Sequence, residues 1–383
     1  MTPRKLEVTW FSNPHEHSVH WIKLGLMRLH KAGTIRLRDI PVTMASSLLA
    51  PVWLQHEYRR GALLRLSDED RNWLIYLDGE DAVFQTSPLL ADCDAYFSCA
   101  FNEPFFQGLP FSMALPWQSP SELAPYMERY AKLQKDLEGH LHKVFPLGPI
   151  GPALEFVPSL SWAQQKWCNL THKLRQRVTS TVDWSHQHRR FEQRMQHLNT
   201  LRQSVPAHDV ILRDSLWGWP RHRVALHERL AALAGRHDIR TQLSWRQAET
   251  YELGEHPAPD AATFPRSSGA PMPADYEAAL AASRLGVFAT GFHYGCRNIV
   301  TLAWYLGLRT YLDPLNFETG CDLSGLEICW NSDGQWSQLE HVLSELAGEG
   351  AADRQRRQAW FDKYLAPEVL ATRMLNQVTG TFL

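Results

Sequence analysis

Two hydrophobic periods follow one another at the start of the chain. Residues 5–11 alternate apolar and polar side chains, and this period of two predicts a strand. Ser12-Asn13-Pro14 interrupts the alternation, and His17 to Lys31 then carries apolar residues at helical spacing. Gly33 ends that helix, and Thr34 to Ile40 is predicted to be a second strand. This β-α-β order favours a parallel sheet with ligands at the carboxyl ends of its strands.

Further apolar segments extend this first domain. Asn72 to Asp78 is predicted to be a strand that ends in Asp-Gly-Glu-Asp, and another strand is expected near Ala95 to Cys99. The segment Phe145-Pro-Leu-Gly-Pro-Ile-Gly-Pro152 is the clearest break in the chain. We therefore expect a domain boundary there.

The second half repeats the alternation of strands and helices after a basic helical stretch from Trp162 to Arg202. The predicted elements are a strand at Val210–Arg213, a helix at Arg221–Ala234, a strand at Ile239–Leu243 and terminal helices at Trp336–Leu346 and Arg354–Val378. Glu255 to Pro273 is rich in Pro, Ala and Ser and is predicted to be a loop. We expect four parts: residues 1–155, 156–205, 206–345 and 346–383.

The segment from Tyr276 to Asp313 carries the clearest chemical signal. It predicts a short helix, a buried strand from Leu285 to Ala289, a loop with two glycines, and a helix that begins near Asn298. Gly307 ends that helix before a strand that stops at Asp313. A strand, a Gly-rich loop and a helix N-terminus form an anion site, because free backbone N–H groups and the helix dipole point at the ligand. A diphosphate suits this geometry.

Composition limits the class of protein. The chain has 383 residues, 44% of them hydrophobic, and contains no apolar run long enough to cross a bilayer. Its net charge of −2 argues against general electrostatic binding of nucleic acid. The six cysteines show no CxxC pair and no metal-ligand spacing, so we expect reduced thiols. A strand begins within the first ten residues, which leaves no room for a signal peptide, and we expect a cytoplasmic protein.

The Tyr276–Asp313 segment resembles the donor-binding part of two-domain GT-B glycosyltransferases, most of all exostosin-like transferases of cell-surface glycans. The positions that carry the resemblance are Ser283, Arg284, Gly291, Arg297 and Gly307. The resemblance implies two Rossmann-like domains that face each other across a cleft, with a C-terminal helix that crosses back to the first domain. Many of these enzymes carry Glu three residues after the loop Arg, where this chain has Val300.

Candidate donor ligands follow from the anion loop and from the resemblance. Gly291 and Gly295 let the backbone approach a phosphate, and Arg297 can bind it in bidentate fashion. A turn with a surface ion pair is the alternative. The full donor-binding set is Arg213, Arg284, Gly291, His293, Gly295, Arg297, Asn298, Asp313 and Glu318. Asp313 or Glu318 would replace the carboxylate missing at Val300.

Candidate catalytic groups lie at the ends of the first-domain strands. An inverting transferase needs a general base near the acceptor hydroxyl, and His15, Glu16, His17 and Asp78 have suitable positions. Helix caps and turns explain the same residues equally well. The His15/His17 alternation lacks a third metal ligand, and GT-B enzymes generally need no metal, so we expect no metal and no cofactor.

The function that the resemblance implies is transfer of a sugar from a nucleotide-sugar donor to a saccharide or lipid-linked saccharide in cell-surface glycan synthesis. The basic helical stretch allows peripheral contact with the inner face of the membrane. One alternative is a sugar-nucleotide epimerase or a catalytically silent relative that binds a nucleotide or a glycan. Another is a transferase that glycosylates nucleic acid, which the net charge argues against.

Overall fold

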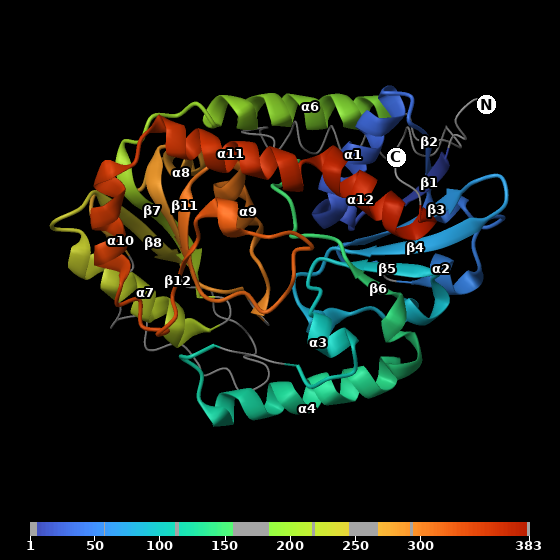
Figure 1. Ribbon diagram of the computed structural model, residues 1–383, viewed down its shortest axis with the longest axis horizontal. Helices are drawn as coiled ribbons and strands as arrows, with labels where there is room; N and C mark the ends of the chain where they lie inside the picture. The colour runs from blue at the N-terminus through green and yellow to red at the C-terminus, as the bar shows by residue number, and fades with distance from the viewer. Residues whose placement is uncertain are drawn as a thin grey trace.

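The chain folds into two α/β domains that lie side by side (Figure 1). The computed structural model describes residues 6–56, 58–111, 115–155, 184–216, 219–244, 267–291 and 294–380. Each domain is built on a six-stranded sheet. The expected architecture of two Rossmann-like domains is therefore confirmed.

The first sheet mixes parallel and antiparallel strands. Its strands are β1 Leu6–Ser12, β2 Ile35–Pro41, β3 Gly61–Ser67, β4 Asn72–Asp78, β5 Ala95–Ser98 and β6 Val144–Pro146. They lie in the order β2-β1-β3-β4-β5-β6, with β3 antiparallel to both of its neighbours and the other pairs parallel. The predicted pairing of the first two strands is correct, and their carboxyl ends point to one edge of the sheet.

Strand β3 was not predicted, because its residues carry a nearly continuous apolar run without alternation. The run Gly-Ala-Leu-Leu-Arg-Leu packs on both faces of the sheet, and Ala62, Leu63 and Leu64 are fully buried. A hairpin turn joins β3 to β4, where the backbone N–H of Asp68 donates to the carbonyl of Arg71.

The second sheet has the strand order of a doubly wound fold. Its strands are β7 His208–Ser215, β8 Ile239–Ser244, β9 Ser267–Ser268, β10 Ser283–Phe288, β11 Arg309–Leu312 and β12 Cys329–Trp330. They lie in the order β12-β11-β10-β7-β8-β9, and β9 is the antiparallel strand at the edge. The chain leaves β7 toward β8 on one side and returns to β10 on the other side.

Helices cover both sheets and connect the domains. The main ones are α1 His20–Lys31, α4 Pro120–Leu137, α6 Trp184–Leu201, α7 Pro220–Leu233, α9 Asn298–Tyr305, α11 Ala351–Leu365 and α12 Pro367–Thr379; shorter ones are α2 Pro51–Gln55, α3 Glu103–Phe106, α8 Tyr276–Ala281 and α10 Leu339–Glu345. Figure 1 shows α11 and α12 running from the second domain to the first, as the C-terminal crossing predicts.

The crossing is close-packed. A Cβ atom built on Gly25 in α1 would lie 2.0 Å from the carbonyl oxygen of Pro367, so only glycine allows α12 to approach α1 this closely. The indole N–H of Trp21 donates to the carbonyl of Leu365 over 2.8 Å. One hydrophobic core is therefore continuous from the first sheet through α1 and α9 into the second sheet.

The basic helical stretch lies partly outside the described residues, which contain it only from Trp184 as α6. Two of its arginines are used inside the protein: Arg194 makes a bidentate pair with Glu277, and Arg202 makes one with Asp362. These two side chains are not available to a membrane surface, and peripheral membrane contact stays a prediction. In the part of the chain that the structure describes, no helix is long and apolar enough to span a bilayer.

Candidate functional site

The candidate site is the carboxyl edge of the second sheet where the strand order reverses, the place at which doubly wound folds form a ligand-binding crevice. The loops that follow β7 and β10 run to opposite sides of the sheet, and ligands of doubly wound folds bind between such loops. Asp214 lies at the end of β7, and the loop that leads from Thr290 to Arg297 follows β10. Helix α9 begins directly after Arg297, which places its N-terminus at the same edge.

A buried carboxylate organises this edge. Asp214 is 3% exposed, and its Oδ1 pairs with Arg223 Nη1 at 2.5 Å and with Arg297 Nη2 at 3.0 Å. Burial alone would raise the pKa of Asp214, but the charges of Arg223 and Arg297 lower it to about 2. Arg223 also donates to the carbonyl of Thr290, so it joins the ends of β7 and β10.

Several polar atoms of this cluster have no hydrogen-bond partner among the described residues. They are Arg297 Nη1, Asp214 Oδ2 and both ring nitrogens of His227. The side chain of His227 is fully buried, and burial lowers its pKa to about 4. Buried polar atoms are nearly always satisfied by protein, water or ligand. Arg297 keeps 22% of its side chain exposed, although its unpaired Nη1 is itself buried.

The first domain presents acidic side chains to the same loop. A Cβ atom on Gly295 would lie 2.6 Å from the carboxyl carbon of Asp81, so the loop and the end of β4 are in direct contact. Burial raises the pKa of Asp81 and of Glu80. Arg60 Nη1 lies 3.5 Å from Asp81 and 3.8 Å from Glu80. The two predicted loops, after β4 and after β10, are therefore placed together across the domain junction.

Asp78 is buried just behind Asp81. Its carboxylate accepts hydrogen bonds from the hydroxyl of Tyr96 at 2.5 Å and from the backbone N–H of Glu80 at 2.9 Å. Burial raises its pKa to about 7, although both hydrogen bonds act in the opposite direction. Asp78 is 3% exposed, so it can exchange a proton near neutral pH but does not itself line the crevice.

Glu16 is not suited to act as a base. It is buried and accepts hydrogen bonds from the indole of Trp10, the backbone of Asn13 and the ammonium of Lys23. Burial would raise its pKa, but Lys23 and His20 hold the pKa at about 2. Such a carboxylate stays ionised and stabilises the fold. The expectation that Glu16 acts as a general base is therefore corrected.

The two predicted histidines remain exposed on the short helical turn that contains Glu16. Partial loss of water around His17, together with the charge of Arg60, lowers the pKa of that ring. Because Arg60 also faces Glu80 and Asp81, His17 lies at the rim of the acidic group. His15 uses its backbone N–H to close a turn on Asn13.

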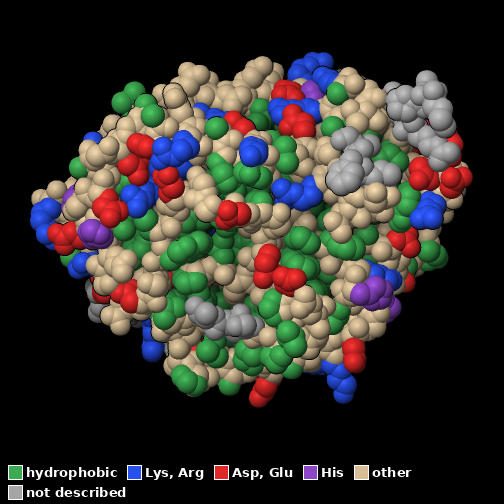
Figure 2. Space-filling model, viewed as in Figure 1, with side chains coloured by type: hydrophobic (Ala, Val, Ile, Leu, Met, Phe, Trp, Pro, Cys, Tyr) green, Lys and Arg blue, Asp and Glu red, His purple; other side chains and the backbone are tan. Residues whose placement is uncertain are grey.

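Two of the predicted donor ligands are placed elsewhere. Arg284 lies near the start of β10, at the opposite edge of the sheet from the crevice, and pairs with Asp209 at 3.6 Å. The helix before it ends at Ala281, three residues earlier than that role requires. Glu318 accepts the backbone N–H of Glu103 at 2.8 Å and so joins the domains at α3. On the face of the molecule seen in Figure 2, acidic side chains gather near the centre, over the domain junction.

Asp313 is a structural clamp. It accepts hydrogen bonds from His222, Asn331 and the backbone N–H of Thr290, all between 2.7 and 2.9 Å, and is 2% exposed. A ribose would have to displace one of these donors. Val300, the position where a carboxylate was expected, is itself 5% exposed and belongs to the core.

The remaining predicted ligands border the crevice. Arg213 is exposed on β7, with its guanidinium 4.9 Å from the ring centre of Tyr276. Asn298 is exposed at the first turn of α9. His293 lies outside the described residues. The sequence interpretation selected Arg213 and passed over Asp214, Arg223 and His227, although the burial that alternation imposes on β7 favours Asp214 as the inward residue.

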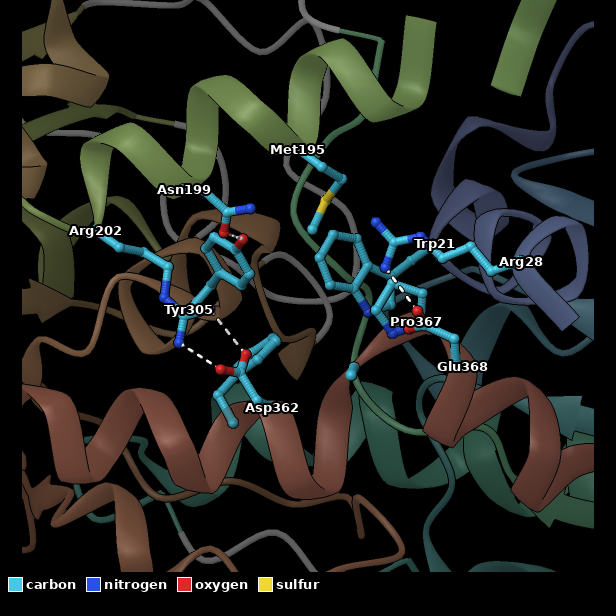
Figure 3. A pocket seen from close by; sticks show the side chains of 11 residues that line it. Trp21, Arg28, Met195, Asn199, Arg202, Tyr305, Asp362, Pro367 and Glu368 are labelled. Atoms are coloured by element: carbon cyan, nitrogen blue, oxygen red, sulfur yellow. Dashed lines mark hydrogen bonds and ion pairs between the residues drawn. The ribbon is translucent and has the colours of Figure 1, made fainter. Parts of the chain in front are cut away.

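A cavity of about 250 Å³ lies away from this site, at the junction of α1, α6, α9, α11 and α12 (Figure 3). Its charged side chains pair with each other: Arg28 with Glu368 at 2.8 Å, and Arg202 with Asp362 at 2.8 Å. The hydroxyl of Tyr305 donates to Asn199. This cavity therefore offers a ligand less unused hydrogen-bonding capacity than the crevice does.

Among the described residues, no group of three or more His, Cys, Asp or Glu side chains is arranged to hold a metal ion. That the protein uses no cofactor stays a prediction.

No family model and no curated protein matches this chain. Among solved structures, it is similar to a putative UDP-N-acetylglucosamine 2-epimerase from Listeria monocytogenes, with 12% identity, a TM-score of 0.36, and 98% of this chain and 97% of that chain covered. It is also similar to UDP-GlcNAc 2-epimerase from Neisseria meningitidis bound to UDP-GlcNAc, with 10% identity, a TM-score of 0.30, and 97% and 99% covered.

These comparisons correct the function expected from the sequence. The similar structures are named as sugar-nucleotide epimerases, whereas the prediction was a glycosyltransferase. That prediction was wrong, and the resemblance to exostosin-like transferases finds no support among them. The architecture of two facing α/β domains stands on the strand order of this chain.

Proposed function

We propose that this chain binds a nucleoside diphosphate sugar in the crevice and acts as a sugar-nucleotide epimerase. The observation that carries the proposal is the partly exposed side chain of Arg297 at the N-terminus of α9, in the loop whose Gly295 contacts Asp81 of the first domain. The two similar structures are named as enzymes of this class, but at their TM-scores the likeness lends the proposal no weight.

The diphosphate would lie against α9. The first backbone N–H groups of a helix have no partner inside the helix, and its dipole favours an anion there. Arg297 adds a guanidinium donor beside these groups, and Asp214 holds that guanidinium in place through the other nitrogen. Both features would hold a phosphate oxygen without a metal ion.

Epimerisation would use the carboxyl groups of the first domain. A carboxylate can remove the proton from the carbon beside the anomeric carbon only as the C–O bond to the diphosphate breaks; readdition of the diphosphate, with a proton returned to the other face, would give the epimer. Asp81 faces the loop, keeps 21% of its side chain exposed and has a raised pKa, so it is the candidate for this exchange. Asp78, with a pKa of about 7, lies behind it as a proton reserve.

The alternative of a catalytically silent nucleotide-binding relative has one observation in its favour. Both oxygens of Asp78 already accept hydrogen bonds within the first domain, and Asp78 is buried. Only Asp81 and Glu80 would then be left to carry out the chemistry.

The test combines binding with isotope exchange. The protein is incubated in D₂O with UDP-, GDP- and CMP-sugars, UDP-GlcNAc included, and each sugar is analysed by NMR and mass spectrometry. Epimerisation breaks a C–H bond and forms a C–D bond, so the substrate and its epimer each gain one deuterium. Asp81→Asn should lose the exchange and keep binding, and Arg297→Ala should lose both.

Arg284→Ala is the matched control, because it removes an arginine from the opposite edge of the same sheet. Binding without deuterium exchange would refute the epimerase and leave the silent relative. If no nucleotide sugar binds to the parent protein, both are refuted.

A further inference from the structure

A segment of the first domain reaches under the second domain and places a tryptophan against it. Figure 1 shows α4 beginning beneath the second domain and ending beneath the first. Residues 115–119, just before α4, form an arm that carries Trp117 and Gln118. Gln118 donates to the hydroxyl of Tyr294, next to the anion loop, over 2.9 Å.

Trp117 lies flat on His222. The two ring centres are 4.2 Å apart with 12° between the planes, which is close parallel stacking. Trp336 also stacks with His222, at 5.1 Å and 28°. Trp219 meets the edge of Trp117 at 5.0 Å and 69°. His222 therefore presents one face to a slot that the indole of Trp117 fills.

The slot is continuous with the crevice. His222 donates through Nε2–H to the carboxylate of Asp313 at 2.9 Å, and Asp313 also accepts the backbone N–H of Thr290, where the anion loop begins. The indole N–H of Trp219 donates to the carbonyl of Gly291 in that loop. A ligand whose phosphates lie at α9 can thus extend a flat ring toward His222.

Unused hydrogen-bonding atoms surround the slot. The indole nitrogens of Trp117 and Trp336 and Oε1 of Gln118 have no partner among the described residues, and Trp336 is 0% exposed. A purely structural contact between domains normally satisfies such groups. Once the arm has withdrawn, the unpaired indole donor of Trp336 would remain for an aromatic heterocycle with carbonyl or ring-nitrogen acceptors.

We propose that the face of His222 on which Trp117 now lies is the stacking surface for the nucleobase of the bound nucleotide, and that Trp117 covers this surface until the arm withdraws. Indole has two fused rings, so the slot is wide enough for a purine or a pyrimidine. This inference rests on the proposed function, because it assigns the base of the nucleotide whose diphosphate lies at Arg297.

Gly334 offers a way to move the arm without removing Trp117. Its φ is 68°, and a Cβ built on it would lie 2.9 Å from the backbone nitrogen of Trp117. Gly334→Ala should therefore push the arm away from the second domain. Trp117→Ala vacates the slot directly, and the two variants check each other if one of them folds poorly.

The experiment is calorimetric titration of pyrophosphate, UDP and ADP into the parent and its variants. Trp117→Ala and Gly334→Ala should each tighten the binding of UDP or ADP by about tenfold, in line with the usual strength of base stacking. Both should leave pyrophosphate binding unchanged. His222→Leu should reduce nucleotide affinity to that of pyrophosphate, whereas His222→Phe, which keeps a flat ring, should retain it.

Trp330→Ala is the control, because Trp330 is an exposed tryptophan of the same domain outside the slot. Equal changes for pyrophosphate and nucleotides in Trp117→Ala would show a general closure contact and overturn the base slot. Nucleotides that bind no better than pyrophosphate in every variant would overturn it as well, while the diphosphate site would stand. If pyrophosphate does not bind to the parent protein, the proposed function fails together with this inference.

Discussion

Each domain buries a charged cluster beside the carboxyl end of its first strand, and the two clusters differ in their access to solvent. In the first domain, Lys23 Nζ lies 2.6 Å from Glu16 and 2.7 Å from Asp39, and none of the three is more than 5% exposed. In the second domain, Arg297 is paired on one side only and is 22% exposed. The closed cluster supports the fold, whereas the partly exposed one is the cluster for which we propose anion binding.

The largest effect should come from breaking the closed cluster. Lys23→Met would leave Glu16 and Asp39 buried without their cation, and we expect the free energy of unfolding to fall by about 3–5 kcal/mol. Urea unfolding followed by circular dichroism measures this loss. Lys132→Met, at an exposed pair with Asp136, should change the same quantity by less than about 1 kcal/mol. Equal effects of the two variants would contradict the comparison.

The next largest effect is on the pH dependence of stability, through His227 of the second-domain cluster. Burial lowers the pKa of His227 from 6.5 to about 4, so the unfolded chain binds more protons between these values. Stability is therefore present above pH 6.5 and is lost as pH falls toward 4. His227→Leu should remove roughly 2–3 kcal/mol of this pH dependence. Urea unfolding at several pH values measures it, with the exposed His341→Leu as control. If the pH dependence of stability is the same in His227→Leu as in the parent protein, the lowered pKa of His227 is disproved.

A smaller effect on stability should accompany a clear effect on binding at the open cluster. In Arg297→Ala, Asp214 keeps its pair with Arg223, so we expect the free energy of unfolding to change by no more than about 1 kcal/mol. Pyrophosphate affinity should fall at least about tenfold, which is typical when a charge-assisted hydrogen bond is lost. Calorimetry and urea unfolding on the same preparation compare the two. A large loss of stability with unchanged binding would make Arg297 a structural residue.

The smallest effect is expected from Arg284→Ala. Its side chain is 43% exposed, and its pair with Asp209 spans 3.6 Å, so removal should cost less than about 0.5 kcal/mol. Pyrophosphate affinity should not change. A weakened affinity in this variant would move the anion site to the other edge of the sheet and would restore the expectation drawn from the sequence.

Strand periodicity was enough to place the ends of β4 and β10, and so the loops that carry Asp81 and Arg297. It could not place Arg284. The preceding helix was predicted to end three residues too late, whereas Arg284 lies near the start of β10, at the opposite end of the strand from the anion loop. It could not assign Glu16 either, because its burial depends on Lys23 and on Asp39, which is 23 positions further along the chain. Pairing at that distance is decided by tertiary packing and is absent from local patterns.

The aromatic slot lies beyond sequence reasoning for a similar reason. Trp117, His222 and Trp336 come from three separate segments, and nothing in their local patterns indicates that they stack. Trp219 is a fourth aromatic residue beside the slot. Its backbone is left-handed, with φ at 48°, and its indole N–H donates to Gly291; neither feature can be predicted from the local pattern.

The glycine contact between α1 and α12 has a consequence for the order of events during synthesis. Helix α1 is complete within the first 31 residues, yet its outer face is covered by residues 367–379. During synthesis α1 therefore emerges from the ribosome long before the helix that packs against it. The final packing of α1 must wait until α12 has left the exit tunnel, so these two helices finish folding together.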